Sequence, residues 1–279
     1  MILALNMGAT ALKFAAYDDD TCVARGVASN VIEILDRVPR PRAIGHRLAH
    51  GGTKHVSPAL VDDALLADLT AAIEFAPHRL PGELEAITTL RARMRDVPQV
   101  ACFDTAFFAT LPQVARTRPD GSRSLGMHGI SYESIIGVLS PAQLRRAAFA
   151  HLGTTSSVAT VRDGQAIDIT PIIDRDGWLA LARTLDMHQL LQSRSTDPRA
   201  ALAFDVFCHA VKKAIGGAAA TLDGLDTLVL TGGIGEHAAA VVQHVCDGLG
   251  FLAIKDVLTL PTDEELTIAR ATRRVVTRS

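Results

Sequence analysis

Short apolar runs separated by small and polar residues open the chain and predict a β-hairpin. Residues 2–5 form one apolar strand, residues 6–11 a turn of small residues, and residues 12–17 the returning strand. The aspartates at 18–20 mark a reversal into a third strand at 22–28. Further along, the pattern predicts helices at 61–75, 81–94, 141–146, 176–194 and 199–222, and strands at 99–103, 251–254 and 257–260.

The hairpin pattern returns in the second half of the chain, where residues 148–161 predict a strand, a small-residue turn and a returning strand. At a spacing of 145 residues three pairs of turn residues coincide: Gly8 with Gly153, Thr10 with Thr155, and Asp18 with Asp163. We therefore predict a duplicated fold, with one domain at residues 1–145 and a second at 146–279. The last helix is expected to pack back on the N-terminal domain.

The stretch from Leu225 to Leu249 predicts a strand, a glycine turn and a helix in that order. The turn comprises Gly232, Gly233, Ile234, Gly235 and Glu236. Glycine lets the backbone approach an anion, and the first amides of a helix attract negative charge. A phosphate site is therefore one interpretation of this turn, and a tight connection without a ligand is the other.

The same turn also fits the dinucleotide pattern G-x-G-x-x-A, with Asp256 about twenty residues on. A dinucleotide fold needs several more strands and helices after that acid, but only residues 255–279 follow. Chain length thus argues against a dinucleotide-binding dehydrogenase. A capping box at residues 262–265 predicts the start of a last helix, which runs to Arg270.

Composition narrows the class of protein. The chain has 279 residues, 48% of them hydrophobic, and a net charge of −2, which suits a large core. It has no basic stripe, two Tyr and one Trp, so we expect no nucleic-acid partner. The N-terminus does not resemble a signal peptide, and no apolar run reaches membrane-spanning length. The separated cysteines in apolar contexts favour reduced core residues and a cytoplasmic location: Cys22, Cys102, Cys208 and Cys246.

Three glycine turns, at residues 6–13, 151–157 and 232–236, predict a nucleotide cleft between the related halves. The two hairpins would face the phosphates, and the third turn the base and ribose. This arrangement resembles the superfamily of sugar kinases, heat-shock ATPases and actin. The resemblance implies an α/β fold of two duplicated ribonuclease-H-like, actin-like ATPase domains around that cleft.

In detail the chain resembles acetate kinases, in motifs that follow one another in the family's order. Residues 1–14 read MILALNMGATALKF, residues 45–52 read GHRLAHGG, and residues 103–112 read FDTAFFATLP. The remaining motifs are LGMHGISY at 125–132, HLGTTSSVA at 151–159, LTGGIGEHAAAV at 230–241 and PTDEELTIAR at 261–270.

The resemblance implies transfer of the γ-phosphoryl group of ATP to a small carboxylate, with Mg²⁺, by a homodimeric enzyme. Such a reaction needs cations for the carboxylate and the phosphoryl group, a metal on phosphate oxygens and donors for transition-state charge. The residues with implied catalytic roles are Lys13, Arg47, Asp104 and His128. Those implied for Mg²⁺ are Asn6, Asp104 and Glu264. Those implied for ATP or ADP are Asn6, Gly8, Thr10, His151, Gly153, Thr154, Thr155, Gly232, Gly233, Gly235 and Glu236.

Several positions depart from the family's pattern. Ala49 and Met127 replace a valine and a phenylalanine beside the acceptor, which predicts room for carboxylates larger than acetate. Residues 75–81 are out of step with the family, so His78 matches no family histidine. A segment carrying a second site arginine is missing between Ile169 and Arg199. One of Arg175, Arg183 or Arg194 is expected to stand in for it. The alternative function is a catalytically weakened nucleotide-binding protein with a regulatory or interaction role.

Overall fold

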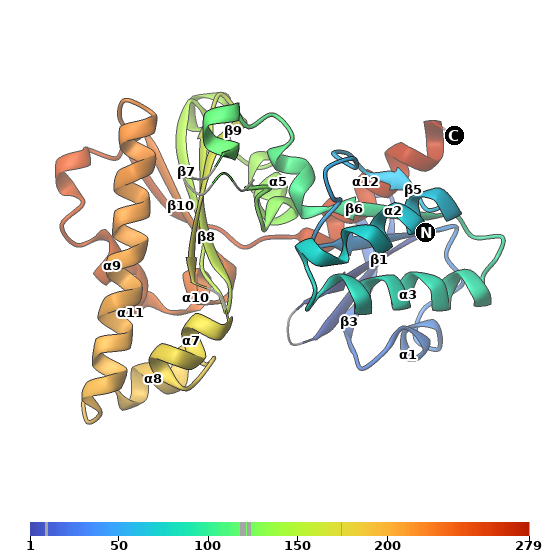
Figure 1. The fold of residues 1–279 in the computed structure, drawn as a ribbon, viewed down its shortest axis with the longest axis horizontal. Coiled ribbons are helices and arrows are strands. Elements are labelled where there is room, and N and C mark those ends of the chain that lie inside the picture. Colours follow the sequence, from blue (N-terminus) through green and yellow to red (C-terminus); the bar gives the residue numbers. More distant parts are fainter. Residues whose placement is uncertain (9–10, 118–120, 122–123, 174, 279) are drawn as a thin grey trace. The chain divides into compact units, whose positions relative to one another are not determined.

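The computed structural model describes residues 1–8, 11–117, 121, 124–173 and 175–278, which fold into two compact units (Figure 1). Among these residues, no helix combines the length and apolar composition that crossing a bilayer requires. The first unit comprises Met1–Ala109, Leu125–Ser134 and Asp263–Ser279, and the second comprises Thr110–Ser124 and Ile135–Thr262.

The first unit is built on a mixed sheet with the strand order β3-β2-β1-β4-β6-β5. β1 pairs antiparallel with β2 and parallel with β4, and β4 pairs parallel with β6. Its strands are β1 (Ile2–Met7), β2 (Leu12–Asp18), β3 (Thr21–Ala28), β4 (Ala43–Leu48), β5 (Ala59–Leu60) and β6 (Gln99–Phe103). Its helices are α1 (Val31–Leu35), α2 (Asp63–Ala71), η1 (Ala72–Phe75), α3 (Leu80–Arg93), η2 (Asp104–Phe108), α5 (Gly129–Ile136) and α12 (Glu264–Arg278), with the last residues of α5 assigned to the second unit.

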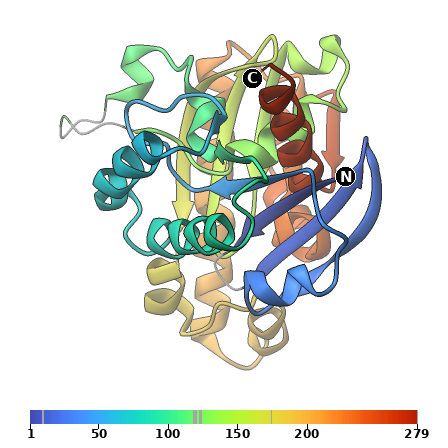
Figure 2. The same ribbon diagram turned by 90° about the vertical axis from the view of Figure 1, so that its right-hand side faces the viewer.

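Helices cover both faces of this sheet, which explains why its central strands β1, β4 and β6 are buried at nearly every position. In β1, Ile2 and Ala4 pack with Ile268 of α12, whereas Leu3 and Leu5 pack with Leu90 of α3. Figure 2 shows α12, in dark red, crossing the strands of this unit. The last helix thus belongs to the sheet formed by the first hundred residues.

The start and length of α12 differ from the predicted helix. Asp263 caps it, because the Asp263 carboxylate accepts from the Leu266 amide at 3.0 Å. The predicted cap at Thr262 is therefore wrong, and Glu265 does not have the role in a capping box that the sequence predicted. The helix also runs to Arg278 rather than Arg270, since its apolar stripe continues along the sheet.

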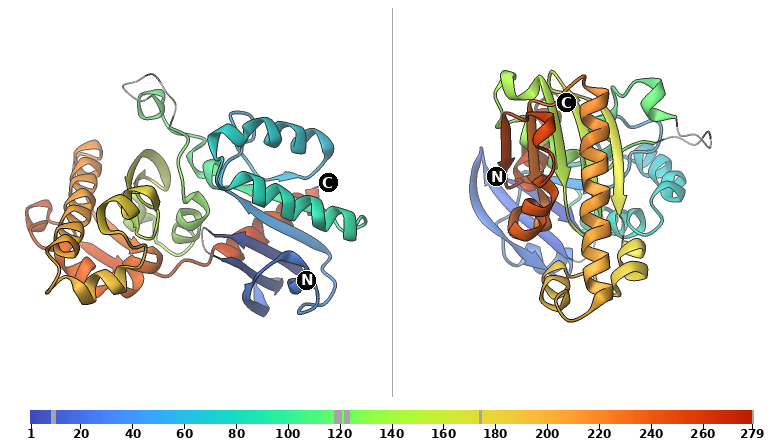
Figure 3. Two further views of the ribbon diagram at one scale, coloured as in Figure 1. Left: turned by 60° about the horizontal axis from the view of Figure 1, so that its bottom comes forward. Right: turned by 90° about the vertical axis from the view of Figure 1, so that its left-hand side faces the viewer.

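The second unit holds a five-stranded sheet with the order β11-β10-β7-β8-β9. The long helix α9 packs against strands of this sheet and against α11. Figure 3 shows α9, in orange, running along the sheet. The strands are β7 (Arg146–His151), β8 (Ser156–Arg162), β9 (Gln165–Ile173), β10 (Thr227–Thr231) and β11 (Asp256–Thr259). The helices are α4 (Gln113–Arg116), α6 (Pro141–Leu144), α7 (Arg175–Ala182), α8 (Met187–Ser193), α9 (Pro198–Thr221), α10 (Gly232–His237), α11 (Ala239–Cys246) and η3 (Gly250–Leu252).

Two predicted elements of this unit are wrong. The single helix expected at 176–194 is divided into α7 and α8, because Arg183 adopts a positive φ of 58° and Asp186 caps a new helix at the His188 amide. The strand expected at 251–254 is replaced by η3 and a left-handed Ala253. Leu252 and Ile254 pack against the core of this unit whereas Phe251 is exposed, so the apolar run did not distinguish a strand from this turn.

The two sheets repeat one topology, as the paired hairpins predict. β3-β2-β1-β4-β6 corresponds in order and direction to β9-β8-β7-β10-β11. The spacing differs slightly from the predicted one beyond the first turn. The reversals fall at Asp19 and Asp163, which have nearly equal φ angles of 51° and 52°. Asp163 therefore corresponds to Asp19 rather than to Asp18.

The cysteines are all free thiols, although their environments differ. Cys102 and Cys208 are buried, and burial raises the pKa of each thiol to about 12. Cys246 is half-buried. Cys22 is exposed on the edge strand β3, so its predicted place in the core is wrong.

Acid should weaken the first unit through His46 on β4. His46 is buried and bonds through Nε2 to Gln99 Oε1 at 2.7 Å, and burial lowers its pKa to about 4. The unfolded chain takes up this proton below about pH 6.5, whereas the folded chain does not. Between pH 6.5 and 5 the free energy of unfolding should fall by about 2 kcal/mol more for the wild type than for His46→Gln. Denaturant unfolding at each pH measures it, and parallel curves would contradict the assignment.

Candidate active site

Polar residues stand at the carboxyl ends of three neighbouring parallel strands in the first unit. Asn6 lies near the end of β1, Arg47 near the end of β4, and Asp104 directly after β6. Because β4 pairs in parallel with both β1 and β6, these ends share one edge of the sheet. Ligands of α/β sheets bind at such edges. The structure therefore brings together three of the predicted site residues.

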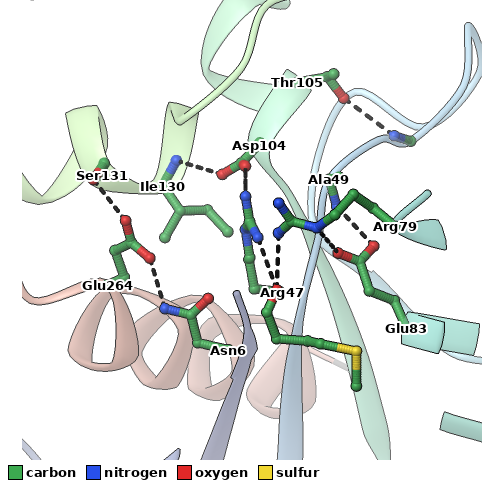
Figure 4. A network of polar contacts seen from close by, with 12 residues as sticks. Asn6, Arg47, Ala49, Arg79, Glu83, Asp104, Thr105, Ile130, Ser131 and Glu264 are labelled. Carbon is green, nitrogen blue, oxygen red and sulfur yellow. Dashed lines mark hydrogen bonds and ion pairs between the residues drawn. The ribbon is translucent and has the colours of Figure 1, made fainter. Parts of the chain in front are cut away.

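Arg47 is held rigidly by Asp104 (Figure 4). Arg47 Nε donates to Asp104 Oδ2 at 3.1 Å, and Nη2 donates to the same oxygen. Nη1 donates to the Met7 carbonyl at 3.0 Å, while Asp104 Oδ1 accepts from the Ile130 amide at 3.2 Å. Both charged side chains are buried. Burial alone would lower the pKa of Arg47, but the neighbouring carboxylates, Asp104 first among them, raise it, so Arg47 stays a cation.

The first turn of α12 adds two carboxylates to the same edge. Asn6 Nδ2 donates to Glu264 Oε2 at 2.6 Å and to Glu265 Oε1 at 2.8 Å. Ser131 Oγ donates to Glu264 Oε1 at 2.6 Å. Carboxylates only accept, so these contacts fix which way the Asn6 amide points. Glu265 and Ser131 were not predicted, because their roles depend on where α12 and α5 begin.

The residues predicted to hold Mg²⁺ offer hard oxygen ligands but no complete shell. In the described part of the chain, no group of three or more His, Cys, Asp and Glu side chains is placed to hold a metal ion. Oxygens of Asp104 and Glu264 already accept hydrogen bonds from the protein. Mg²⁺ in phosphoryl-transfer sites takes one or two carboxylates and fills its shell with water and phosphate. The donor set fits that mode of binding.

The other predicted residues of the first unit have different surroundings. His128 is buried, has a left-handed φ of 61°, and stands edge-on to Tyr132 with ring centroids 6.5 Å apart. Lys13 is exposed on β2, opposite Asn6 in the register. The Gly8 amide donates to the Ala11 carbonyl at 2.8 Å, so this amide is hydrogen-bonded within its own turn. Thr10 lies outside the described residues.

Sequence reasoning missed a second arginine beside Arg47. Arg79, just before α3, donates from Nη2 to the Met7 carbonyl at 2.8 Å, the same oxygen that Arg47 contacts. Its Nε lies 3.8 Å from Oε1 of the buried Glu83, whose Oε2 accepts from the Ala49 amide at 2.9 Å. The one available sequence signal was that Arg79 is a charged residue within residues 75–81, the segment that is out of step with the family's pattern.

In the second unit, the glycine turn after β10 is closed onto the end of β7. The turn is helical, and the Ile234 and Gly235 amides donate to the Leu152 carbonyl at 2.9 and 3.4 Å. Gly232 has a φ of 78°, and a Cβ there would lie 2.6 Å from the same carbonyl. Glu236 Oε1 accepts from the Gly232 amide at 3.0 Å. Gly232, Gly235 and Glu236 therefore hold the turn in shape.

A pocket of about 400 Å³ opens beside this turn. Gly233 borders it and is exposed, and the pocket also takes in Gly153 and Thr154 of the second hairpin. Its remaining wall comes from the start of α8 and from the residues around α10: Leu185, Asp186, Met187, His188, Leu191, Ile234, His237 and Ala238. His151 and Thr155 flank the same hairpin at the end of β7 and in the loop that follows. Two of the predicted glycine turns thus meet at one pocket within this unit.

The arginines expected to stand in for a missing second cation lie in the second unit. Arg194 is placed over the Phe204 ring, with its guanidinium carbon 4.3 Å from the ring centroid. Arg183 provides the left-handed residue that ends α7. The side chain of Arg175 lies outside the described part of the chain. Their catalytic role stays a prediction.

Comparison with known proteins relates the chain to acetate kinases. An acetate kinase of Clostridium botulinum (strain Okra / Type B1) is 29% identical over 326 residues, which cover 90% of this chain and 80% of that protein. The acetate kinase of Thermoanaerobacterium thermosaccharolyticum is 30% identical over 311 residues, which cover 84% of this chain and 78% of that protein.

Solved structures show the same fold. A propionate kinase from Francisella tularensis superposes with a TM-score of 0.87 at 24% identity, over 98% of this chain and 99% of that one. The acetate kinase of Entamoeba histolytica gives 0.86 at 22% identity, over 99% of each. The predicted actin-like ATPase fold of two α/β domains is thereby confirmed.

The model of the acetokinase family matches residues 23–172 and 170–277. The family predicted from the sequence motifs is confirmed, and membership supports a carboxylate kinase function. Because the family model accounts for nearly all of the chain, the protein belongs to the acetokinase family.

Proposed function

We propose that this protein is a carboxylate kinase that uses ATP to convert a short-chain carboxylate into an acyl phosphate, reversibly. A carboxylate oxygen attacks the γ-phosphorus, the bond from that phosphorus to the β,γ-bridging oxygen breaks, and ADP leaves. The observation that carries the proposal is Arg47, a cation fixed by buried Asp104 where three parallel strands end.

Arg47 and Asp104 are assigned to charge and orientation. A guanidinium offers a planar fork of N–H donors that suits a carboxylate or phosphate. Asp104 and the Met7 carbonyl take three of these donors and hold the fork in one direction. Such preorganised charge stabilises the transition state because it needs no rearrangement during reaction. His128 is proposed as a further donor to the transferring group.

Asn6, Asp104 and Glu264 are the residues that would hold Mg²⁺, directly or through water. When bound, the metal would neutralise charge on the phosphate oxygens. Within the protein, the Asn6 amide joins Glu264 to Glu265, and Ser131 fixes the other Glu264 oxygen. These contacts keep the first turn of α12 aligned with the end of β1.

The nucleotide is assigned to the second unit. Gly153, Thr154 and Gly233 border its pocket, and exposed Gly233 leaves the space beside the backbone open. ATP or ADP is proposed to bind there through its base and ribose. Lys13 and the turn residues Gly8 and Thr10 are proposed for the phosphates. A homodimer and a cytoplasmic location are proposals that rest on the family resemblance.

The acceptor is proposed to be larger than acetate. Ala49 and Met127 stand where the family has a valine and a phenylalanine, and neither is fully buried. A methyl group and a flexible thioether leave more space than a branched chain and a ring. Propionate or butyrate should therefore give a kcat/KM at least equal to that of acetate.

Trapping the product with hydroxylamine tests both proposals. Purified protein with ATP and Mg²⁺ should form hydroxamates from a panel of short carboxylates, and omission of ATP should abolish them. A much higher kcat/KM with acetate than with propionate and butyrate would contradict the proposed acceptor. No hydroxamate from any carboxylate would contradict the kinase assignment.

A further inference from the structure

We infer that Arg79 is a second substrate-binding cation of this site and contacts the acceptor carboxylate beside Arg47. The inference rests on the proposed function and assigns a residue that the acetate kinase motifs do not include. It explains how a chain without the family's second arginine segment can still present two guanidinium groups to an anion.

The first observation is the shared acceptor. Arg47 Nη1 and Arg79 Nη2 both donate to the Met7 carbonyl, at 3.0 and 2.8 Å. Figure 4 shows the two guanidinium groups converging on this oxygen from β4 and from the residue before α3. The Met7 carbonyl is neutral and adds no charge to the counter-charges that Asp104 and Glu83 provide. An anionic oxygen beside this pair would lower their repulsion and bond to both.

The second observation is the incomplete pairing of Arg79 with Glu83. Arg79 Nε and Glu83 Oε1 are buried atoms without a hydrogen-bond partner among the described residues, and they lie 3.8 Å apart. Glu83 is held away by the Ala49 amide, which donates to its other oxygen at 2.9 Å. Buried polar atoms in folded proteins are rarely left without partners. Glu83 is therefore only a partial partner of Arg79, because no hydrogen bond joins the two side chains.

The electrostatic surroundings agree with this geometry. Burial and the positive charge of Arg47 lower the pKa of Arg79, and burial raises the pKa of Glu83. Burial thus disfavours the charged form of both side chains, and the Glu83, Asp104 and Glu264 carboxylates offset only part of this effect at Arg79. A bound carboxylate would add a further negative charge next to the two arginines and favour the charged form of Arg79.

The position of Arg79 also suits contact with the carboxylate substrate. Ala49, which borders the proposed acceptor space, is tied to Glu83 and through it to Arg79. Arg194, an expected substitute, lies in the second unit over Phe204. The cation beside Arg47 is thus supplied by the start of α3, 32 residues further along the chain.

Arg79→Met and Arg79→Lys test the inference against Arg91→Met, a matched control on α3, the helix that Arg79 precedes. Arg91 is partly exposed and pairs with Asp63 at 2.9 Å. Arg79→Met should raise the KM for propionate on the order of 10- to 100-fold, because a charge-assisted contact is lost. The KM for ATP should change less than twofold. Arg79→Lys should recover part of the loss, and Arg91→Met should match the wild type.

The double variant Arg79→Met/Glu83→Gln separates binding from structure, because it removes both charges of the buried pair. If Arg79 only neutralised Glu83, the double variant would regain wild-type KM for propionate, and the inference would be overturned. We expect it to regain stability and keep the high KM. Calorimetric titration with acetyl phosphate adds a readout that needs no turnover. Weaker binding by Arg79→Met supports the inference even if the wild type forms no hydroxamate. Unchanged binding and an unchanged KM would overturn the inference and leave the proposed kinase function standing.

Discussion

Replacing Asp104 by Asn should lower kcat by about 100-fold or more and the free energy of unfolding by about 3 kcal/mol. The carboxylate accepts two donors of Arg47 and the Ile130 amide in a buried site. Asparagine has one acceptor oxygen and no charge, so Arg47 becomes a buried cation without its counter-charge. The fork then loses the direction that we propose it needs in the transition state. Hydroxamate formation and denaturant unfolding measure the two effects.

Asp96→Asn is the matched control. Asp96 pairs with Arg40 in the same unit, but both side chains are well exposed. An exposed ion pair contributes about 0–1 kcal/mol, so this variant should keep its activity and nearly all its stability. Equal effects at the two aspartates would contradict the role given to burial.

Gly233→Val should weaken ATP binding at least 100-fold, equivalent to about 2.7 kcal/mol, and leave the protein folded. A Cβ at Gly233 meets no protein atom within 4 Å, and the residue borders the pocket beside α10. The valine would therefore occupy space assigned to the nucleotide without disturbing the turn. In a helix, valine is no less favourable than glycine. Calorimetry with ATP measures the loss.

Gly217→Val provides the comparison, because Gly217 is also helical, exposed and free of neighbours within 4 Å. It should bind ATP as the wild type does. Gly232→Ala should instead disturb folding, since Gly232 has a φ of 78° and an added Cβ would lie 2.6 Å from the Leu152 carbonyl oxygen. Unchanged ATP affinity in Gly233→Val would exclude this pocket as the nucleotide site.

The features that could be predicted from sequence are those fixed by local pattern. The hairpins, the duplicated order of strands and the grouping of Asn6, Arg47 and Asp104 follow from apolar runs that end at polar residues. Parallel pairing then brings those ends to one edge. The division of the chain into domains at residue 145 stays a prediction.

The missed features depend on packing between segments far apart in sequence. Arg79 lies out of step with the family's motif, so its place beside Arg47 follows only from how α3 packs on β4. The cap of α12 was predicted at Thr262, one residue before the observed cap at Asp263. A threonine hydroxyl and an aspartate carboxylate differ little in capping strength. The extra polar contacts of Ser131 and Glu265 follow from those helix starts.

The central claim is that this chain transfers a phosphoryl group between a nucleotide and a carboxylate at the site of Arg47 and Asp104. Its most direct test is ATP formation from ADP, Mg²⁺ and propionyl phosphate, followed with luciferase for the wild type and Asp104→Asn. We predict steady ATP synthesis by the wild type, at a rate at least 100-fold lower in the variant. ADP binding of normal affinity without any ATP synthesis by the wild type would contradict the claim and favour a nucleotide-binding protein without catalysis.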